Sequence, residues 1–118
     1  MKDKEYISLE KIIEYIERAK RYTKGYTFEM FTEDEKTRDA TVFAISQIGE
    51  LIKNISKELM DKYDFIEWNM IKGLRNRIVH DYEGINLKSI WYVINNDLST
   101  LEDDIRKIIA LELNKREE

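Results

Sequence analysis

The sequence predicts an all-α protein, an antiparallel up-and-down bundle of four to five helices. Three observations predict it. The 118 residues include no proline and only four glycines, the two residue types that most often interrupt helices. Apolar residues recur at steps of three and four along most of the chain, which is the stripe of an amphipathic helix. No stretch has the composition of a linker, a repeat or a low-complexity tract, so residues 1–118 are expected to form a single domain.

The first helix is expected to begin at Ser8, a candidate N-cap, and to end at Gly25, a candidate stop. Its apolar stripe consists of Leu9, Ile12, Ile13, Ile16 and Ala19.

The second helix is expected after "TEDE" at 32–35, where Thr32 and Glu35 have the spacing of a capping box. Its stripe runs from Ala44 to Leu59. Gly49 lies inside this helix, where glycine costs about 1 kcal/mol relative to alanine. A close approach by another helix at Gly49 is the expected reason.

A third helix is expected from about Phe65 to His80 or just past it, breaking near Gly84. On a wheel of about 100° per residue, its core side carries Met70, Ile71, Leu74 and Ile78. The opposite side carries Asn69, Lys72, Asn76 and His80, with Gly73 leaving room among them for a ligand or a second chain. The last helical stretch is expected from Leu87 to the C-terminus, with a kink or cap within residues 95–100.

The composition excludes several classes of protein. Charged residues make up 37% of the chain and hydrophobic residues 42%, which is typical of a globular protein. The chain has no cysteine, no signal-like N-terminus and no apolar run of the roughly 20 residues that cross a bilayer. We therefore expect a cytoplasmic protein without a membrane association. The net charge of −4 argues against a non-specific coat on nucleic acid, but not against a local site.

The stretch "GLRNRIVHDYEG" at 73–84 is the candidate site. Residues 71–80 carry Lys72, Arg75 and Arg77 with no acid among them, so positive potential is focused there and these side chains are expected to bind or orient an anionic substrate. Arginine binds phosphate bidentately. His80 is the only histidine, and histidine exchanges protons near neutral pH. These residue types point to a reaction at a phosphodiester.

The spacing of these residues sets a geometric condition. A lone histidine is more often a satisfied core or surface residue, but the wheel places His80 away from the core. Asn76 lies one turn before His80 and can orient its ring. Arg75 lies five residues from His80, which is about 140° away on an ideal helix. The two can meet on one phosphate only if the helix loosens at His80 or a second subunit completes the cleft.

Cleavage of RNA by internal transfer needs both a base and an acid, and one chain supplies one histidine. A symmetric dimer with two such side chains would meet this need, and water or Tyr82 are alternatives. With one histidine and no cysteine, only carboxylates remain as metal ligands, so we expect neither a metal nor a cofactor. Taken alone, Tyr82 would be interpreted as an aromatic residue packing at a helix end.

Arg75, four residues, His80, one residue and Tyr82 together resemble the RxxxxHxY signature of HepT-like toxins in the HEPN superfamily. Three longer blocks are similar to the family in the same order: "FTEDEKTRDATVFAISQIGELIKNIS" at 31–56, "WNMIKGLRNRIVHDYEGIN" at 68–86 and "IWYVINNDLSTLEDDI" at 90–105. The departures are local. Glu67 and Ser99 stand where the family usually has proline, and Leu51 and Lys53 stand where small residues are common.

The resemblance implies a homodimeric helical bundle and a metal-independent endoribonuclease that acts as the toxin of a toxin–antitoxin pair. It implies that Arg75 binds the developing phosphorane, that His80 is the acid or base, and that Asn76 orients or contacts the RNA substrate. It also implies a partner, a minimal nucleotidyltransferase (MNT) antitoxin that silences the toxin by transferring AMP to Tyr82. One alternative is a non-catalytic nucleotide- or partner-binding subunit of a nucleotidyltransferase complex. Another is a purely structural helical adaptor.

Overall fold

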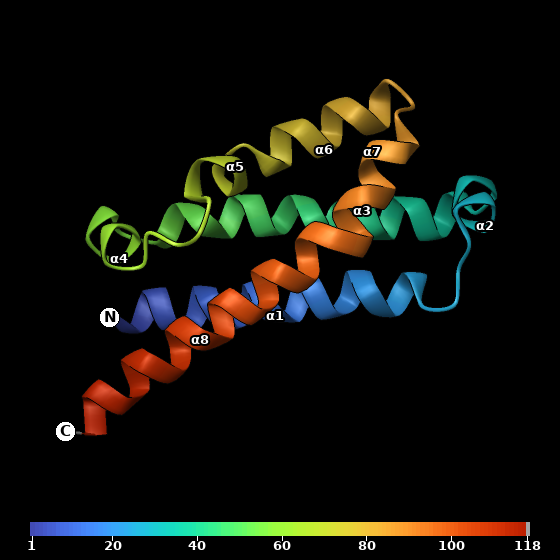
Figure 1. Ribbon diagram of the computed structural model, residues 1–118. Helices are drawn as coiled ribbons and strands as arrows, with labels where there is room; N and C mark the ends of the chain where they lie inside the picture. The colour runs from blue at the N-terminus through green and yellow to red at the C-terminus, as the bar shows by residue number, and fades with distance from the viewer. Residues whose placement is uncertain (118) are drawn as a thin grey trace.

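The computed structural model describes residues 1–117, with side chains as far as Lys115, and every secondary-structure element within that range is helical (Figure 1). Helix α1 (Asp3–Thr23) lies antiparallel to α3 (Glu35–Leu51), and α6 (Leu74–Glu83) packs along the other flank of α3. Helix α8 (Leu98–Glu117) returns across α1. The predicted all-α, antiparallel up-and-down bundle is therefore confirmed.

Short elements connect these long helices. Helix α2 (Phe28–Glu33) precedes α3, a 3-10 turn (Ile52–Asn54) and α4 (Lys57–Lys62) follow it, and α5 (Trp68–Lys72) leads into α6. Helix α7 (Leu87–Tyr92) joins α8 through a π-helical turn, Val93–Asp97. That turn overlaps, at residues 95–97, the stretch where a kink or cap was expected. It gives the chain an offset at the point where α7 becomes α8 (Figure 1).

The apolar stripe predicted for α1 is confirmed, because all five of its residues are buried. The predicted start at Ser8 is wrong: α1 begins at Asp3, and Ser8 is buried within it. There the Ser8 hydroxyl accepts a hydrogen bond of 3.0 Å from the Asn54 amide nitrogen. The predicted stop is confirmed, since α1 ends at Thr23 and Gly25 adopts a φ of +78°, which favours glycine.

The second predicted helix is in fact two, α3 and α4, separated by residues 52–56. Its expected capping box is wrong: Asp34, not Thr32, caps α3, and accepts a hydrogen bond of 3.0 Å from the amide of Thr37. After α3 ends, the Ser56 hydroxyl accepts from the amide of Leu59 and starts α4. Each cap satisfies amides that a helix start leaves without partners, which is why new helices begin there.

The third predicted helix is also two, because the chain turns at Gly73 between α5 and α6. Ile71, Leu74 and Ile78 are buried as expected. Met70 is not: 47% of it is exposed, so its place on the core side was wrong. One helical wheel cannot span both helices, since the break at Gly73 changes their relative phase. The predicted end is confirmed, with α6 stopping at Glu83 before Gly84.

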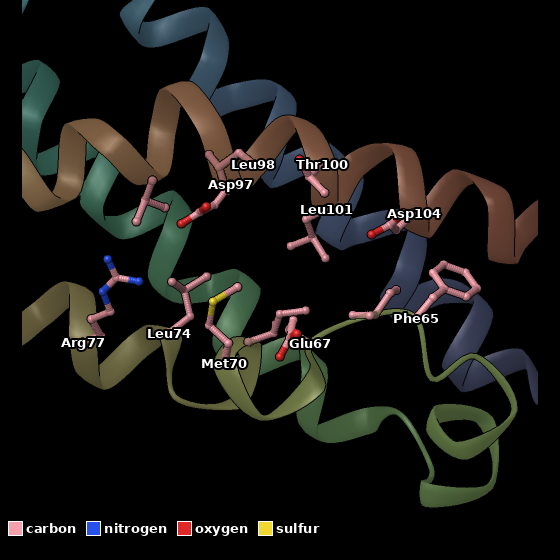
Figure 2. A pocket seen from close by; sticks show the side chains of 13 residues that line it. Phe65, Glu67, Met70, Leu74, Arg77, Asp97, Leu98, Thr100, Leu101 and Asp104 are labelled. Atoms are coloured by element: carbon pink, nitrogen blue, oxygen red, sulfur yellow. The ribbon is translucent and has the colours of Figure 1, made fainter.

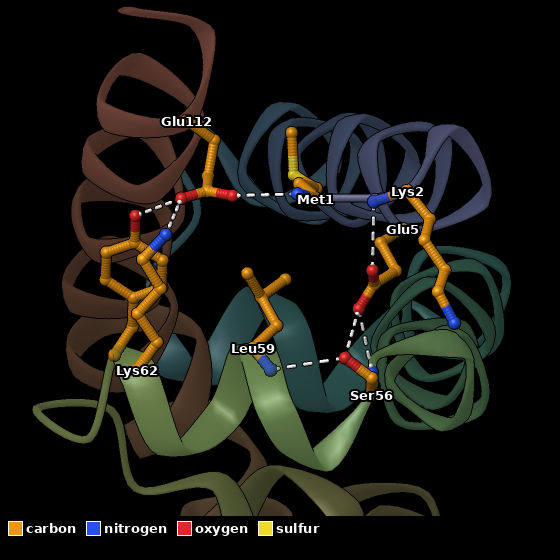
Figure 3. A network of polar contacts seen from close by, with 8 residues as sticks. Met1, Lys2, Glu5, Ser56, Leu59, Lys62 and Glu112 are labelled. Carbon is orange, nitrogen blue, oxygen red and sulfur yellow. Dashed lines mark hydrogen bonds and ion pairs between the residues drawn. The ribbon is translucent and has the colours of Figure 1, made fainter. Parts of the chain in front are cut away.

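Two buried carboxylates link α1, α4 and α8 at one end of the bundle (Figure 3). Glu112 of α8 is 2.7 Å from the Lys62 ammonium, accepts a hydrogen bond from the Tyr63 hydroxyl, and is 3.1 Å from the amino group of Met1. Burial by itself raises the pKa of Glu112, but these bonds outweigh it and hold the pKa at about 2. Glu5 of α1 accepts from the Ser56 amide and hydroxyl at 2.9 and 2.7 Å. The bonds join α1, α4 and α8.

Candidate functional site

The predicted site residues Arg75, Asn76, His80 and Tyr82 all lie on α6, a regular helix of 10 residues. Helix α6 runs antiparallel to α3, and two contacts define how the two helices are aligned. At one end, Gly49 lies against the backbone of Arg75. At the other, Tyr82 is hydrogen-bonded to Asp39. The motif therefore lies on one of two packed helices rather than on a loop.

Arg75 is held by two neighbours. Its Nε is 3.3 Å from Oε1 of Glu50 on α3, and its Nη1 donates to Oδ1 of Asn76 at 3.2 Å. The other oxygen of Glu50 accepts a hydrogen bond of 3.1 Å from Lys53. Half of the Arg75 side chain stays exposed. The guanidinium is thus oriented by a carboxylate and still accessible to an anion.

His80 projects into solvent. Its side chain is 89% exposed, and its Nδ1 lies 3.8 Å from Oδ1 of the Asp81 carboxylate. Asn76, expected to orient the ring, instead accepts the hydrogen bond from Arg75. The wheel was right to place His80 outside the core. An exposed imidazole can meet a substrate without any rearrangement of the fold.

The directions in which the Arg75 and His80 side chains point are determined by α6, which carries both residues. The helix continues without a break from Leu74 to Glu83, so it does not loosen at His80. Five residues of regular helix separate the two side chains by about 140° around the axis and about 7.5 Å along it. Of the two routes by which they could share one phosphate, loosening of the helix is therefore not observed. A second subunit is the route that remains.

Tyr82 lies at the C-terminal end of α6, where its hydroxyl donates a hydrogen bond to the exposed carboxylate of Asp39. Burial raises the pKa of Tyr82, and the bond to Asp39 raises it further, while Arg38 opposes both. The phenol is therefore protonated at neutral pH. Although the ring is partly buried, its hydroxyl reaches the surface beside Asp39.

The structure does not bring Arg77 or Lys72 to Arg75. Arg77 donates a hydrogen bond of 3.2 Å to the Ser89 hydroxyl on α7 and lines an apolar groove of about 170 Å³ between α5–α6 and α8 (Figure 2). Lys72 is the last residue of α5, exposed and one residue before the turn at Gly73. Arg77 on α6 and Lys72 on α5 therefore have no recorded contact in common with Arg75, whose guanidinium lies beside Glu50.

Three acidic residues contact the predicted site residues and were not predicted as part of the site. They are Glu50 at Arg75, Asp39 at Tyr82 and Asp81 at His80. The sequence did offer a signal that Glu50 belongs to the site, because Glu50 ends the Ile-Gly-Glu in the block at 31–56 that is similar to the family. Asp81 had the same signal, since it is the middle residue of the His-Asp-Tyr in the block at 68–86. Asp39 had no such signal, because single acids are common on solvated helix faces.

No three carboxylate or imidazole side chains within the described part of the chain lie together as metal ligands would. Nor is any helix between residues 1 and 117 both long enough and apolar enough to span a bilayer.

Comparison with known proteins gives a consistent result. A family model described as "Ribonuclease HepT-like" matches residues 12–108. A protein of Caldanaerobacter subterraneus named "Putative RNase TTE0752" is 34% identical over 104 residues, which cover 88% of this chain and 93% of the relative. A protein of Thermococcus cleftensis named "Probable ribonuclease HepT" is 31% identical over 100 residues, which cover 85% of this chain and 91% of the relative. No solved structure matches the chain.

Proposed function

The chain belongs to the family of HepT-like ribonucleases, and we propose that it is itself an endoribonuclease, metal-independent and acting as the toxin of a toxin–antitoxin pair. The observation that carries the proposal is the pairing on one rigid helix of a guanidinium held by Glu50 and an imidazole that is 89% exposed. The names of its relatives support the same activity.

The proposed chemistry is internal transfer at a phosphodiester. A ribose 2′ oxygen attacks the neighbouring phosphorus and the bond to the 5′ oxygen breaks, so one proton is removed and another is supplied. His80 exchanges a proton, which an imidazole can do near neutral pH. Arg75 stays charged and stabilises the added negative charge on the phosphoryl oxygens. Asn76, already bonded to Arg75, keeps the guanidinium in place or contacts the RNA.

We place the reaction between two copies of the chain. Since α6 directs Arg75 and His80 about 140° apart, a partner subunit is needed to bring an arginine and a histidine to one phosphate. A two-fold arrangement also supplies a second imidazole, so that one can act as base and the other as acid. A dimer would therefore bring an arginine and a histidine to the same phosphate and would also supply both an acid and a base.

Tyr82 is the proposed point of neutralisation by an MNT-type nucleotidyltransferase antitoxin. The phenol oxygen would displace pyrophosphate from the α-phosphorus of ATP and carry AMP. Its hydroxyl lies at the surface, hydrogen-bonded to the exposed Asp39, so a second enzyme can reach it. The added phosphate would bring bulk and negative charge two residues from His80, where the RNA phosphate is proposed to bind.

The test is cleavage of a fluorescent single-stranded RNA in the presence of a metal chelator, with purified parent protein and His80→Ala. The parent should cut and the variant should lose at least 100-fold in rate. The variant should keep its helical circular dichroism, because the imidazole packs against nothing in the core. Equal cleavage by parent and variant would refute the assignment of His80.

A second function is favoured by one observation. The divergence of Arg75 and His80 on an unbroken α6 suits a non-catalytic nucleotide- or partner-binding subunit of a nucleotidyltransferase complex. That function predicts intact RNA after long incubation of the dimer, together with stable co-purification of the nucleotidyltransferase. Cleavage abolished by His80→Ala would exclude it as the main function.

A further inference from the structure

Asp81 is a nearly buried carboxylate that the proposed chemistry does not use. It follows His80 directly on α6, yet only 13% of its side chain is exposed, against 89% for His80. Its Oδ2 is fully buried and has no hydrogen-bond partner in the described structure. Buried acceptors in native proteins are nearly always satisfied, so an unsatisfied one points to a role beyond packing.

Two cations or potential cations flank this carboxylate, one at each oxygen. Arg77 Nε lies 3.8 Å from Oδ2, and His80 Nδ1 lies 3.8 Å from Oδ1. Arg77 is itself anchored, because its Nη2 donates to the Ser89 hydroxyl of α7 at 3.2 Å. A line of polar groups therefore runs from α7 through Arg77 and Asp81 to the exposed imidazole.

We propose that Asp81 is the positioning residue of His80. Its Oδ1 accepts a hydrogen bond from Nδ1–H, which fixes the neutral imidazole in the Nδ1–H form and leaves the Nε2 lone pair free for the substrate. Arg77 lies at the other oxygen and keeps the carboxylate aligned. The present separation of 3.8 Å exceeds a hydrogen bond, so the exposed ring has to turn toward Oδ1 for the bond to form.

A carboxylate at one nitrogen of a histidine determines which nitrogen carries the proton, and so which one can act as base. Without it, a solvent-exposed neutral imidazole favours the Nε2–H form, whose outward nitrogen cannot take a proton from a ribose hydroxyl. Asp81 would thus do for His80 what Asn76 does not, since Asn76 is bonded to Arg75.

The competing explanation is mechanical: Asp81 would serve only to anchor Arg77 and brace α6 against α7. The two explanations differ in an observable that does not depend on activity. His80 is the only histidine of the chain, so its ring nitrogens give the only imidazole signals in a ¹⁵N-labelled sample. Two-bond ¹H–¹⁵N spectra at about pH 9, where an ordinary imidazole is neutral, report its tautomer directly.

The parent protein should show mainly the Nδ1–H form, and Asp81→Asn should convert it mainly to Nε2–H. In that variant the amide oxygen is drawn to Arg77, so the amide NH₂ faces His80 and the ring must accept at Nδ1. Glu83→Gln, the matched change at an exposed acid of the same helix, should leave the tautomer unchanged. A parent already in the Nε2–H form, or a tautomer that Asp81→Asn does not move, would overturn the proposal.

The catalytic consequence rests on the proposed function and is measured separately. In the RNA cleavage assay, Asp81→Asn should lower kcat roughly tenfold or more with little change in KM. The reason is that Nε2 of His80 then carries the proton and cannot act as the base, whereas the phosphate contact at Arg75 is kept. A change of tautomer with unchanged kcat would refute the role in the reaction. If the parent cuts no RNA, the proposed function fails and the spectra still decide the role of Asp81. If Asp81→Asn does not fold, the tautomer of the parent alone decides it.

Discussion

Gly49 on α3 lies directly against the backbone of Arg75 on α6: a Cβ atom at position 49 would be 2.7 Å from the Arg75 amide nitrogen and 3.0 Å from its Cβ. The two helices can approach this closely only because residue 49 has no side chain. That approach brings the neighbouring Glu50 within 3.3 Å of the Arg75 guanidinium. A glycine that is unfavourable for its own helix thus determines where the candidate catalytic arginine lies.

Gly49→Ala should therefore destabilise the protein and weaken RNA cleavage together. The added methyl group meets backbone rather than a movable side chain, so α6 must shift, at about 1–3 kcal/mol of unfolding free energy. Gly73→Ala is the matched control, since its Cβ would meet nothing closer than 3.7 Å. Urea unfolding of both variants measures the difference. Equal stability of the two would contradict the close approach described here.

Glu50→Gln should separate binding of RNA from its cleavage. The amide keeps the shape of the side chain but removes the charge that orients Arg75, so we expect kcat to fall roughly 10-fold or more. Loss of one negative charge beside the guanidinium should leave KM unchanged or lower it. Steady-state cleavage of a fluorescent RNA measures both. The control is Glu58→Gln at an exposed acid of α4, and a rise in KM with unchanged kcat would argue against a positioning role for Glu50.

The sequence predicted those features that depend on local periodicity. The apolar stripe of α1, the stop at Gly25 and the burial of Ile71, Leu74 and Ile78 follow from spacing alone and are confirmed. The close approach at Gly49 could also be anticipated, because an unfavourable glycine inside a helix needs a packing reason.

Helix boundaries and acidic partners could not be predicted in the same way. The start of α1 at Asp3 is stabilised by the Glu5 carboxylate, which accepts hydrogen bonds from the backbone amides of Lys2 and Ser56. Ser56 lies 51 residues further along the chain than Glu5. Asp39 becomes a partner of Tyr82 only when α3 and α6 are aligned antiparallel. Such pairs are formed by the assembled fold and leave no local pattern.

Tyr82→Phe should block modification without abolishing cleavage. The phenol oxygen is the proposed acceptor of AMP, whereas the ring only packs at the end of α6. Intact mass of the protein co-expressed with an MNT-type nucleotidyltransferase, the proposed partner, should rise in AMP-sized steps for the parent and stay constant for the variant. Loss of the hydrogen bond to Asp39 should lower stability by only about 1 kcal/mol. The same mass increase in Tyr82→Phe would place the modification on another residue.

Glu112 should govern acid unfolding, because bonds to Lys62 and Tyr63 hold its pKa at about 2, against a usual value of 4.5. Since the folded-state pKa is the lower one, the stabilisation is complete above about pH 4.5 and is lost as the pH falls toward 2. The shift corresponds to about 3 kcal/mol of unfolding free energy.

Glu112→Gln should therefore unfold more easily at pH 7 and show a flatter decline in stability between pH 4.5 and 2 than the parent. Urea unfolding at three pH values across this range measures the slope. Asp103→Asn, which changes an exposed acid on the same helix, should reproduce the parent slope. If Glu112→Gln declined as steeply as the parent, some other carboxylate would have to carry the acid sensitivity. Glu5, whose pKa is also lowered through its bonds to Ser56 and Lys2 against the opposing effect of burial, would then be the next to test.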